Sequence, residues 1–130
     1  MEGLYRKYRN RVAVYVVYIR EAHPEDGWQV PANLREKVVF TQPKTVEERT
    51  HVARTFCTRL KLSIPCLIDE LDDKVNRAYA AWPDRLYVVG RDGEIVYKSG
   101  RGPRGFKPAE AEQALRQYLK THPVQPAATQ

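Results

Sequence analysis

The sequence predicts one α/β domain in which strands and helices alternate, and three observations support this class. Residues 12–19 are β-branched and aromatic with apolar side chains on both faces, as in a strand covered by helices on two sides. Residues 45–61 open with a T-x-x-E capping box and continue with apolar residues at helical spacing. Residues 85–98, RLYVVGRDGEIVYK, hold two apolar runs joined across Arg91, Asp92 and Gly93, which indicates a β-hairpin.

The first half of the chain supplies a helix, a strand and a long connection. Residues 2–9 have apolar side chains on one face and predict a short helix that starts without a capping residue. The strand at residues 12–19 follows. Residues 20–44 then predict a loop rich in turn-forming residues, and loops of this length in compact domains usually carry function.

The second half completes a βαβ crossover and adds two helices. Residues 65–69, PCLID, predict the returning strand. A helix is then expected from Asp72 or Asp73, with a buried face made of Val75, Ala78, Tyr79 and Trp82. After the hairpin, Pro108 opens a last helix whose inner stripe comprises Ala111, Ala114, Leu115, Tyr118 and Leu119. We therefore expect a domain over residues 1–121 and a flexible tail over residues 122–130.

Composition excludes several classes of protein. Lys and Arg number 22 against 16 Asp and Glu, giving a net charge of +6, but the basic residues are dispersed and form no arginine-rich arm. A nucleic-acid partner is therefore not favoured. No signal peptide or membrane span is evident, so we expect a cytoplasmic protein without a membrane partner. The acidic cluster at residues 69–72 is spaced like the start of a helix, and we expect no metal site.

The stretch YIREAHPEDGW follows the first strand directly and is the first candidate site. Tyr18, Glu21 and His23 are proton-handling side chains, and the carboxyl edge of an α/β sheet is where such folds bind ligands. A plainer reading makes Glu21 a loop cap, gives His23 a local hydrogen bond and buries Trp28 as a core anchor. Spacing alone favours the plainer reading.

Three longer segments carry a resemblance to a known family. VYIREAHPEDGWQVP, QPKTVEERTHVAR and AYAAWPDRLYVVGRDGEIVYKSGRGPRGF resemble the iodothyronine deiodinases, especially their bacterial deiodinase-like members, and the similarity covers roughly residues 3–120. The resemblance implies a thioredoxin-like mixed sheet with flanking helices, related to peroxiredoxins. It also implies attack by a thiolate or selenolate on a halogenated aromatic molecule or a peroxide. An external thiol reductant, with no further cofactor, would complete the cycle.

The same resemblance assigns roles to individual residues. The family's proton-relay and substrate site is matched by Tyr18, Glu21 and His23. For Glu21 and His23 this match outweighs the plainer structural reading. For Trp28 it does so only weakly. Arg101, between two glycines in GRGPRG, matches an arginine near the phenolic or carboxylate end of the substrate.

Three residues of the second half have competing structural explanations. The glycines around Arg101 are also typical of a plain turn. Trp82 matches a residue beside the pocket, yet its place on a helical stripe favours a core position. Arg85 corresponds to an arginine that holds a nucleophile's charge in peroxiredoxin-like folds, or it forms an ion pair with Asp84 or Glu94.

The sequence departs from the family at the nucleophile. Cys57 falls in the middle of a predicted helix and Cys66 starts a strand, whereas an activated thiolate lies at a helix N-terminus. The family's nucleophile lies before the first helix, after a strand that would sit between residues 12–19 and 85–98 at the centre of the sheet. Three explanations stay open: a truncated reading of the gene, a degenerate chain that dimerises, or a deliberately shortened chain.

The sequence thus supports three functional hypotheses. The first is a deiodinase-like thiol or selenol oxidoreductase whose nucleophilic segment is missing from residues 1–130, so that the chain alone is inactive. The second is a non-catalytic thioredoxin-fold interaction module that recruits a partner strand, or a second copy, at an exposed sheet edge. The third is a basic nucleic-acid-binding domain.

Overall fold

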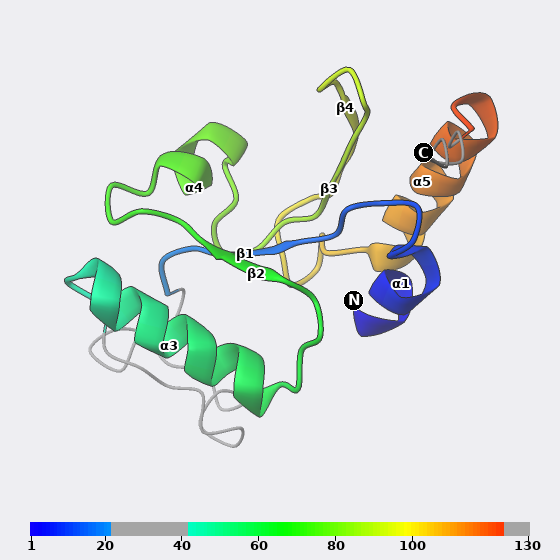
Figure 1. Cartoon of the computed structure of the whole chain (residues 1–130). Helices are drawn as coiled ribbons and strands as arrows, with labels where there is room; N and C mark the ends of the chain where they lie inside the picture. Colours follow the sequence, from blue (N-terminus) through cyan, green and yellow to red (C-terminus); the bar gives the residue numbers. More distant parts are fainter. Residues whose placement is uncertain (22–41, 124–130) are drawn as a thin grey trace, which may run out of the picture. The chain divides into compact units, whose positions relative to one another are not determined.

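A computed structural model describes residues 1–21 and 42–123, which contain four helices and four strands (Figure 1). Helices and strands alternate along the chain, and both parallel and antiparallel strand pairing occur. The predicted α/β class is confirmed, and the arrangement is consistent with a thioredoxin-like fold. Contacts divide the described residues into two compact units, one made of residues 13–21 and 42–83 with Glu2, the other of Met1 and residues 3–12 and 84–123.

A parallel strand pair forms the centre of the first unit. Strand β1, Val16–Tyr18, pairs with strand β2, Cys66–Ile68, so that Tyr18 lies opposite Ile68. The predicted βαβ crossover is therefore confirmed, although β1 is shorter than residues 12–19. Val17 points away from the covered face and is 38% exposed, so the prediction of a strand buried on both faces is wrong for this position. Among the described residues of this unit, only one face of the pair carries a long helix.

That helix is α3, Val46–Arg59, which lies along the strand pair in Figure 1. The capping box is confirmed: the Glu48 backbone N–H donates to Thr45 Oγ1 at 3.1 Å, and the Thr45 N–H donates to Glu48 Oε2 at 3.3 Å. Beneath the helix lies an apolar cluster of Tyr18, Val52 and Ala53, with Phe56, Cys66 and Ile68 packed against it. This cluster places the N-terminal turns of α3 next to the carboxyl ends of both strands.

Helix α4, Lys74–Tyr79, differs from the helix that we predicted. Its buried residue is Asn76, whereas Ala78 and Tyr79 are exposed, and Trp82 lies beyond the end of the helix with 38% exposure. The predicted apolar face is therefore wrong. A helix of six residues is too short to form a continuous apolar face. Hydrogen bonds made by buried polar side chains hold α4 in place instead.

The predicted β-hairpin is confirmed in the second unit. Strand β3, Tyr87–Val89, pairs antiparallel with β4, Ile95–Lys98, with an irregularity after Val88. Gly93 in the connecting turn has φ +86°, a left-handed conformation that a side chain would disfavour. Among the described residues each strand of the protein has one partner, β1 with β2 and β3 with β4.

Two helices complete the second unit. Helix α5, Pro108–Thr121, begins with proline in its first turn as predicted, and helix α1, Glu2–Tyr8, lies beside it. Tyr8 packs with Leu115 and Leu119, and its hydroxyl donates to Glu112 Oε1 at 3.0 Å. An apolar core and a partly buried hydrogen bond thus join the two helices.

Within residues 1–21 and 42–123, no helix combines the length and apolar character needed to cross a bilayer. Most of the predicted loop over residues 20–44 lies outside the described residues, as does most of the predicted tail. The domain boundary after residue 121 stays a prediction.

Candidate functional site

An open cavity of about 550 Å³ lies in the first unit, where the chain leaves β1 and β2. Its charged and aromatic lining comprises Arg20, Glu21, Lys44, Arg49, Asp73 and Trp82. These residues come from four segments: the end of β1, the entry to α3, the first turns of α3, and the chain around α4. Open α/β sheets bind ligands at the carboxyl ends of their strands, so this cavity is the candidate site.

Glu21 is half-buried in this cavity, three residues after the end of β1. Burial raises the pKa of Glu21 from its ordinary 4.5 to about 7, and the positive charge of Arg49 acts in the opposite direction. A carboxyl group with a pKa near neutrality is protonated often enough to act as a general acid and is readily recharged. The predicted proton-handling residue therefore lies in an environment suited to proton transfer.

Arg49 is the residue of this site that the sequence analysis missed. Only 2% of it is exposed, and its Nη1 donates to the backbone oxygens of Asp69, at 3.2 Å, and Glu70, at 2.6 Å. The same nitrogen lies 3.2 Å from Asp73 Oδ1 in an ion pair. A signal was present, because residues 49, 52, 53 and 56 follow the helical spacing of a buried stripe, and an arginine at one of these positions indicates a buried charge.

Trp82 lines the cavity, so the prediction of a core position is wrong. The guanidinium carbon of Arg20 lies 5.6 Å from the centroid of the Trp82 ring, within the range of a cation–π contact. Arg20 Nη1 also lies 4.0 Å from Asp73 Oδ2. Trp82 therefore offers an aromatic surface beside alternating charges.

A buried carboxylate and a buried amide hold this edge of the cavity. The Asp69 carboxylate accepts hydrogen bonds from the backbone N–H groups of Val75, at 2.9 Å, and Asn76, at 2.8 Å. The Asn76 side-chain oxygen accepts from the Trp82 N–H at 3.0 Å. The predicted role of the acidic cluster as a helix start is confirmed, although the first capping carboxylate lies at residue 69, before the helix. These bonds connect the end of β2 to α4 and to Trp82.

Tyr18 lies apart from the cavity lining. Its ring is buried in the cluster beneath α3, with its centroid 5.7 Å from that of Phe56. Its hydroxyl is buried and has no hydrogen-bond partner among the described residues. Of the predicted residues of this unit, the structure therefore brings Glu21 and Trp82 together and places Tyr18 in the core, while His23 and Trp28 lie outside the described residues.

Arg101 belongs to the second unit, in a tight turn. The Gly105 N–H donates to the Arg101 backbone oxygen at 2.8 Å, and the Gly102 N–H donates to that of Asp84 at 3.1 Å. A Cβ on Gly102 would lie within 2.2 Å of the Asp84 carboxyl group and would force that side chain to move, whereas a Cβ on Gly105 would meet the backbone of Gly100 at 2.4 Å. The turn explains the glycines, while the Arg101 side chain is exposed and its predicted role in substrate binding stays a prediction.

Arg85, at the start of the hairpin, does not form the ion pair that we considered. Neither Asp84 nor Glu94 lies within ion-pair distance of it, and its buried Nε has no hydrogen-bond partner in the part of the chain that the structure describes. Burial raises the pKa of the Asp84 carboxyl group. The predicted role of Arg85 in charge stabilisation stays a prediction.

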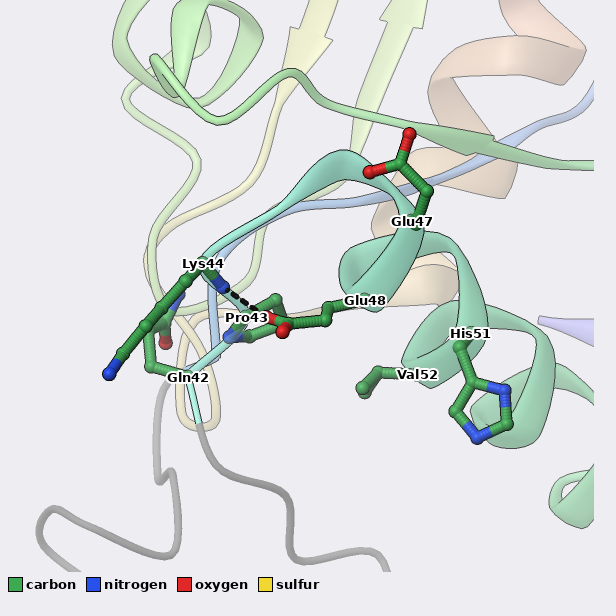
Figure 2. A pocket seen from close by; sticks show the side chains of 7 residues that line it. All are labelled: Gln42, Pro43, Lys44, Glu47, Glu48, His51 and Val52. Carbon is green, nitrogen blue, oxygen red and sulfur yellow. Dashed lines mark hydrogen bonds between the residues drawn. The ribbon is translucent and has the colours of Figure 1, made fainter.

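A second open cavity, of about 570 Å³, lies along the start of α3 (Figure 2). Figure 2 shows the Glu48 side chain turned back toward Lys44. The backbone N–H of Lys44 donates a hydrogen bond to Glu48 Oε2 at 2.7 Å. His51 is exposed. The Glu48 carboxylate is thus used in capping the helix, and this cavity holds no convergent set of reactive groups among its described residues.

Comparison with known proteins decides the family. A family model described as iodothyronine deiodinase matches residues 1–119. The chain belongs to the iodothyronine deiodinase family. Thyroxine 5-deiodinase of Sparus aurata is 38% identical over 105 residues, which cover 79% of this chain. Those of Rattus norvegicus and Homo sapiens are 34% and 33% identical over 120 residues, or 90% of this chain.

This deiodinase-family chain spans 37% of the length of each of these three relatives. Its two thiols, Cys57 and Cys66, are both half-buried. Burial, together with a hydrogen bond with the Cys57 thiol, raises the pKa of Cys66 to about 12. The raised pKa keeps the Cys66 thiol protonated at neutral pH.

Proposed function

We propose that this chain forms the proton-donating part of a deiodinase-like thiol or selenol oxidoreductase, which removes halogen from aromatic molecules or reduces peroxides. The observation that carries the proposal is Glu21, half-buried in the first-unit cavity with a pKa of about 7. Membership of the iodothyronine deiodinase family supports the thiol or selenol redox chemistry, and the burial of Glu21 in the cavity supports its role as the proton donor. Trp82 adds an aromatic surface suited to stacking against a substrate ring.

The reaction balances as follows. A thiolate or selenolate attacks the halogen of an aryl halide, so that a sulfur–halogen or selenium–halogen bond forms while the carbon–halogen bond breaks. The aryl carbon takes a proton, which Glu21 supplies, with His23 as a further member of the relay. Two external thiols then reduce the sulfur–halogen or selenium–halogen bond, which releases halide and a disulfide and restores the nucleophile.

The nucleophile of this proposal is neither Cys57 nor Cys66. The raised pKa of Cys66 keeps it protonated, and both thiols, Cys57 within α3 and Cys66 at the start of β2, are half-buried. We propose that a cysteine or selenocysteine outside residues 1–130 acts in their place, and that Arg85 and Arg101 assist substrate binding.

The test is thiol-dependent dehalogenation by the full-length product of the gene, assayed by halide release from iodinated phenols and in parallel by peroxide consumption. The variant Glu21→Gln keeps the shape of the side chain but cannot supply a proton. We expect it to lower kcat about a hundredfold, within the range of a lost general acid. Cys57→Ser and Cys66→Ser are expected to retain activity.

Glu94→Gln is the matched control, because Glu94 is exposed on the hairpin and its side chain has no part in the cavity. We expect it to leave kcat unchanged. Absence of both activities in a folded full-length protein would overturn the proposed function. A Glu21→Gln variant as active as Glu94→Gln would remove Glu21 from it.

A further inference from the structure

Arg49 is buried to an extent that is rare for an arginine, and its contacts connect separate segments of the first unit. Its Nη1 binds two consecutive backbone oxygens after β2 and the carboxylate of Asp73 at the start of α4. Its Nε is buried and has no hydrogen-bond partner among the described residues. A buried guanidinium needs paired charges and hydrogen bonds, and Arg49 lines a cavity that also holds the Glu21 carboxyl group.

Four charged groups line the cavity together with Glu21, each from a different segment. Arg20 follows β1 and is half-exposed, Lys44 precedes α3 and is exposed, and Asp73 starts α4. Arg49 is the one buried cation of this described lining. Interactions between exposed charges are screened by solvent and salt, whereas those of a buried charge are screened much less. The positive charge of Arg49 lowers the pKa of Glu21, and the same guanidinium is paired with the Asp73 carboxylate.

We propose that Arg49 is the positioning residue for Glu21: its buried guanidinium, which is paired with Asp73 and lines the same cavity as Glu21, determines how readily the Glu21 carboxyl group releases its proton. This inference rests on the proposed function in assigning that proton to catalysis. The charge balance itself is a property of the folded chain. When Glu21 is protonated, Arg49 is paired with Asp73 alone, and when Glu21 ionises, Arg49 stabilises both carboxylates.

The experiment is a carbon-13 NMR titration of the Glu21 side-chain carboxyl, with the resonance assigned by its loss in Glu21→Gln. Arg49→Met removes the charge and keeps an unbranched apolar side chain, so the Glu21 midpoint should rise by about one pH unit. Arg49→Lys keeps the charge and should stay near the wild-type midpoint. Asp73→Asn removes the competing carboxylate, and the midpoint should fall. Arg54→Met, on the exposed side of the same helix, is the matched control and should change nothing.

The pH profile of kcat/KM in the full-length protein supplies a second readout. Its alkaline limb, which follows loss of the Glu21 proton, should move to higher pH in Arg49→Met and to lower pH in Asp73→Asn. A folded Arg49→Met whose Glu21 midpoint equals that of Arg54→Met would overturn the inference. If Arg49→Met does not fold, an Asp73→Asn midpoint that fails to fall would do the same. Midpoints that move as expected in a protein without dehalogenase or peroxidase activity would overturn the proposed function and leave the charge coupling standing.

Discussion

Replacing Asp69 with alanine should destabilise the protein strongly, although the residue lies outside the cavity lining. Asp69 is 2% exposed, and its two oxygens accept hydrogen bonds from two successive N–H groups in the first turn of α4. Water cannot replace these acceptors without opening the packing around the end of β2. Asp69→Ala therefore leaves two donors without partners at a buried helix N-terminus.

The size of the effect follows from the cost of each donor. Leaving a buried donor unsatisfied costs about 1 to 3 kcal/mol, so two of them predict a loss of about 3 kcal/mol in the free energy of unfolding. Asp69→Asn retains one acceptor oxygen and should lose about half as much. Asp72 provides the control, because its carboxylate also accepts from a first-turn N–H, that of Lys74 at 3.1 Å, but is exposed. Asp72→Ala should cost less than about 1 kcal/mol, since water replaces it.

Urea unfolding monitored by far-ultraviolet circular dichroism measures these differences in one series. The expected order of midpoints is wild type, Asp72→Ala, Asp69→Asn and Asp69→Ala, from the highest urea concentration to the lowest. A midpoint for Asp69→Ala equal to that for Asp72→Ala would refute the reasoning, because burial would then not distinguish the two caps.

Two further predictions concern groups whose pKa is raised. Because the pKa of folded Glu21 is about 7 instead of 4.5, the wild type is stabilised by this proton at low pH and loses that stability as the pH rises through 7. The full shift corresponds to about 3 kcal/mol, which partial exposure reduces to about 1–2 kcal/mol, and Glu21→Gln should abolish this dependence in urea titrations from pH 4 to pH 8. Cys66, with a pKa of about 12, should react with iodoacetamide at pH 8 roughly a hundredfold more slowly than a free cysteine when alkylation of its own peptide is followed by mass spectrometry in the wild type. A rate equal to that of the free thiol would show that burial does not protect it.

The elements that could be predicted from the sequence are those with a local chemical signature. The capping box at Thr45 and Glu48 is confirmed because both partners lie within one turn of each other. Gly93 in the hairpin and Pro108 at the start of α5 are confirmed for the same reason, since each acts through its own backbone angles. The short helix α4 was assigned the wrong buried face, because its stability depends on a carboxylate that lies before it in the chain.

The candidate site shows the same difference between features encoded by neighbouring residues and features that depend on distant ones. Glu21 could be proposed from its residue type, its place after a strand and its resemblance to a family, none of which needs coordinates. Its protonation state depends instead on burial and on the charge of Arg49, which lies 28 positions further along the chain. Short-range patterns are written in neighbouring residues, whereas desolvation and charge pairing arise when distant segments meet, so the acid–base character of this cavity became visible once the chain was folded.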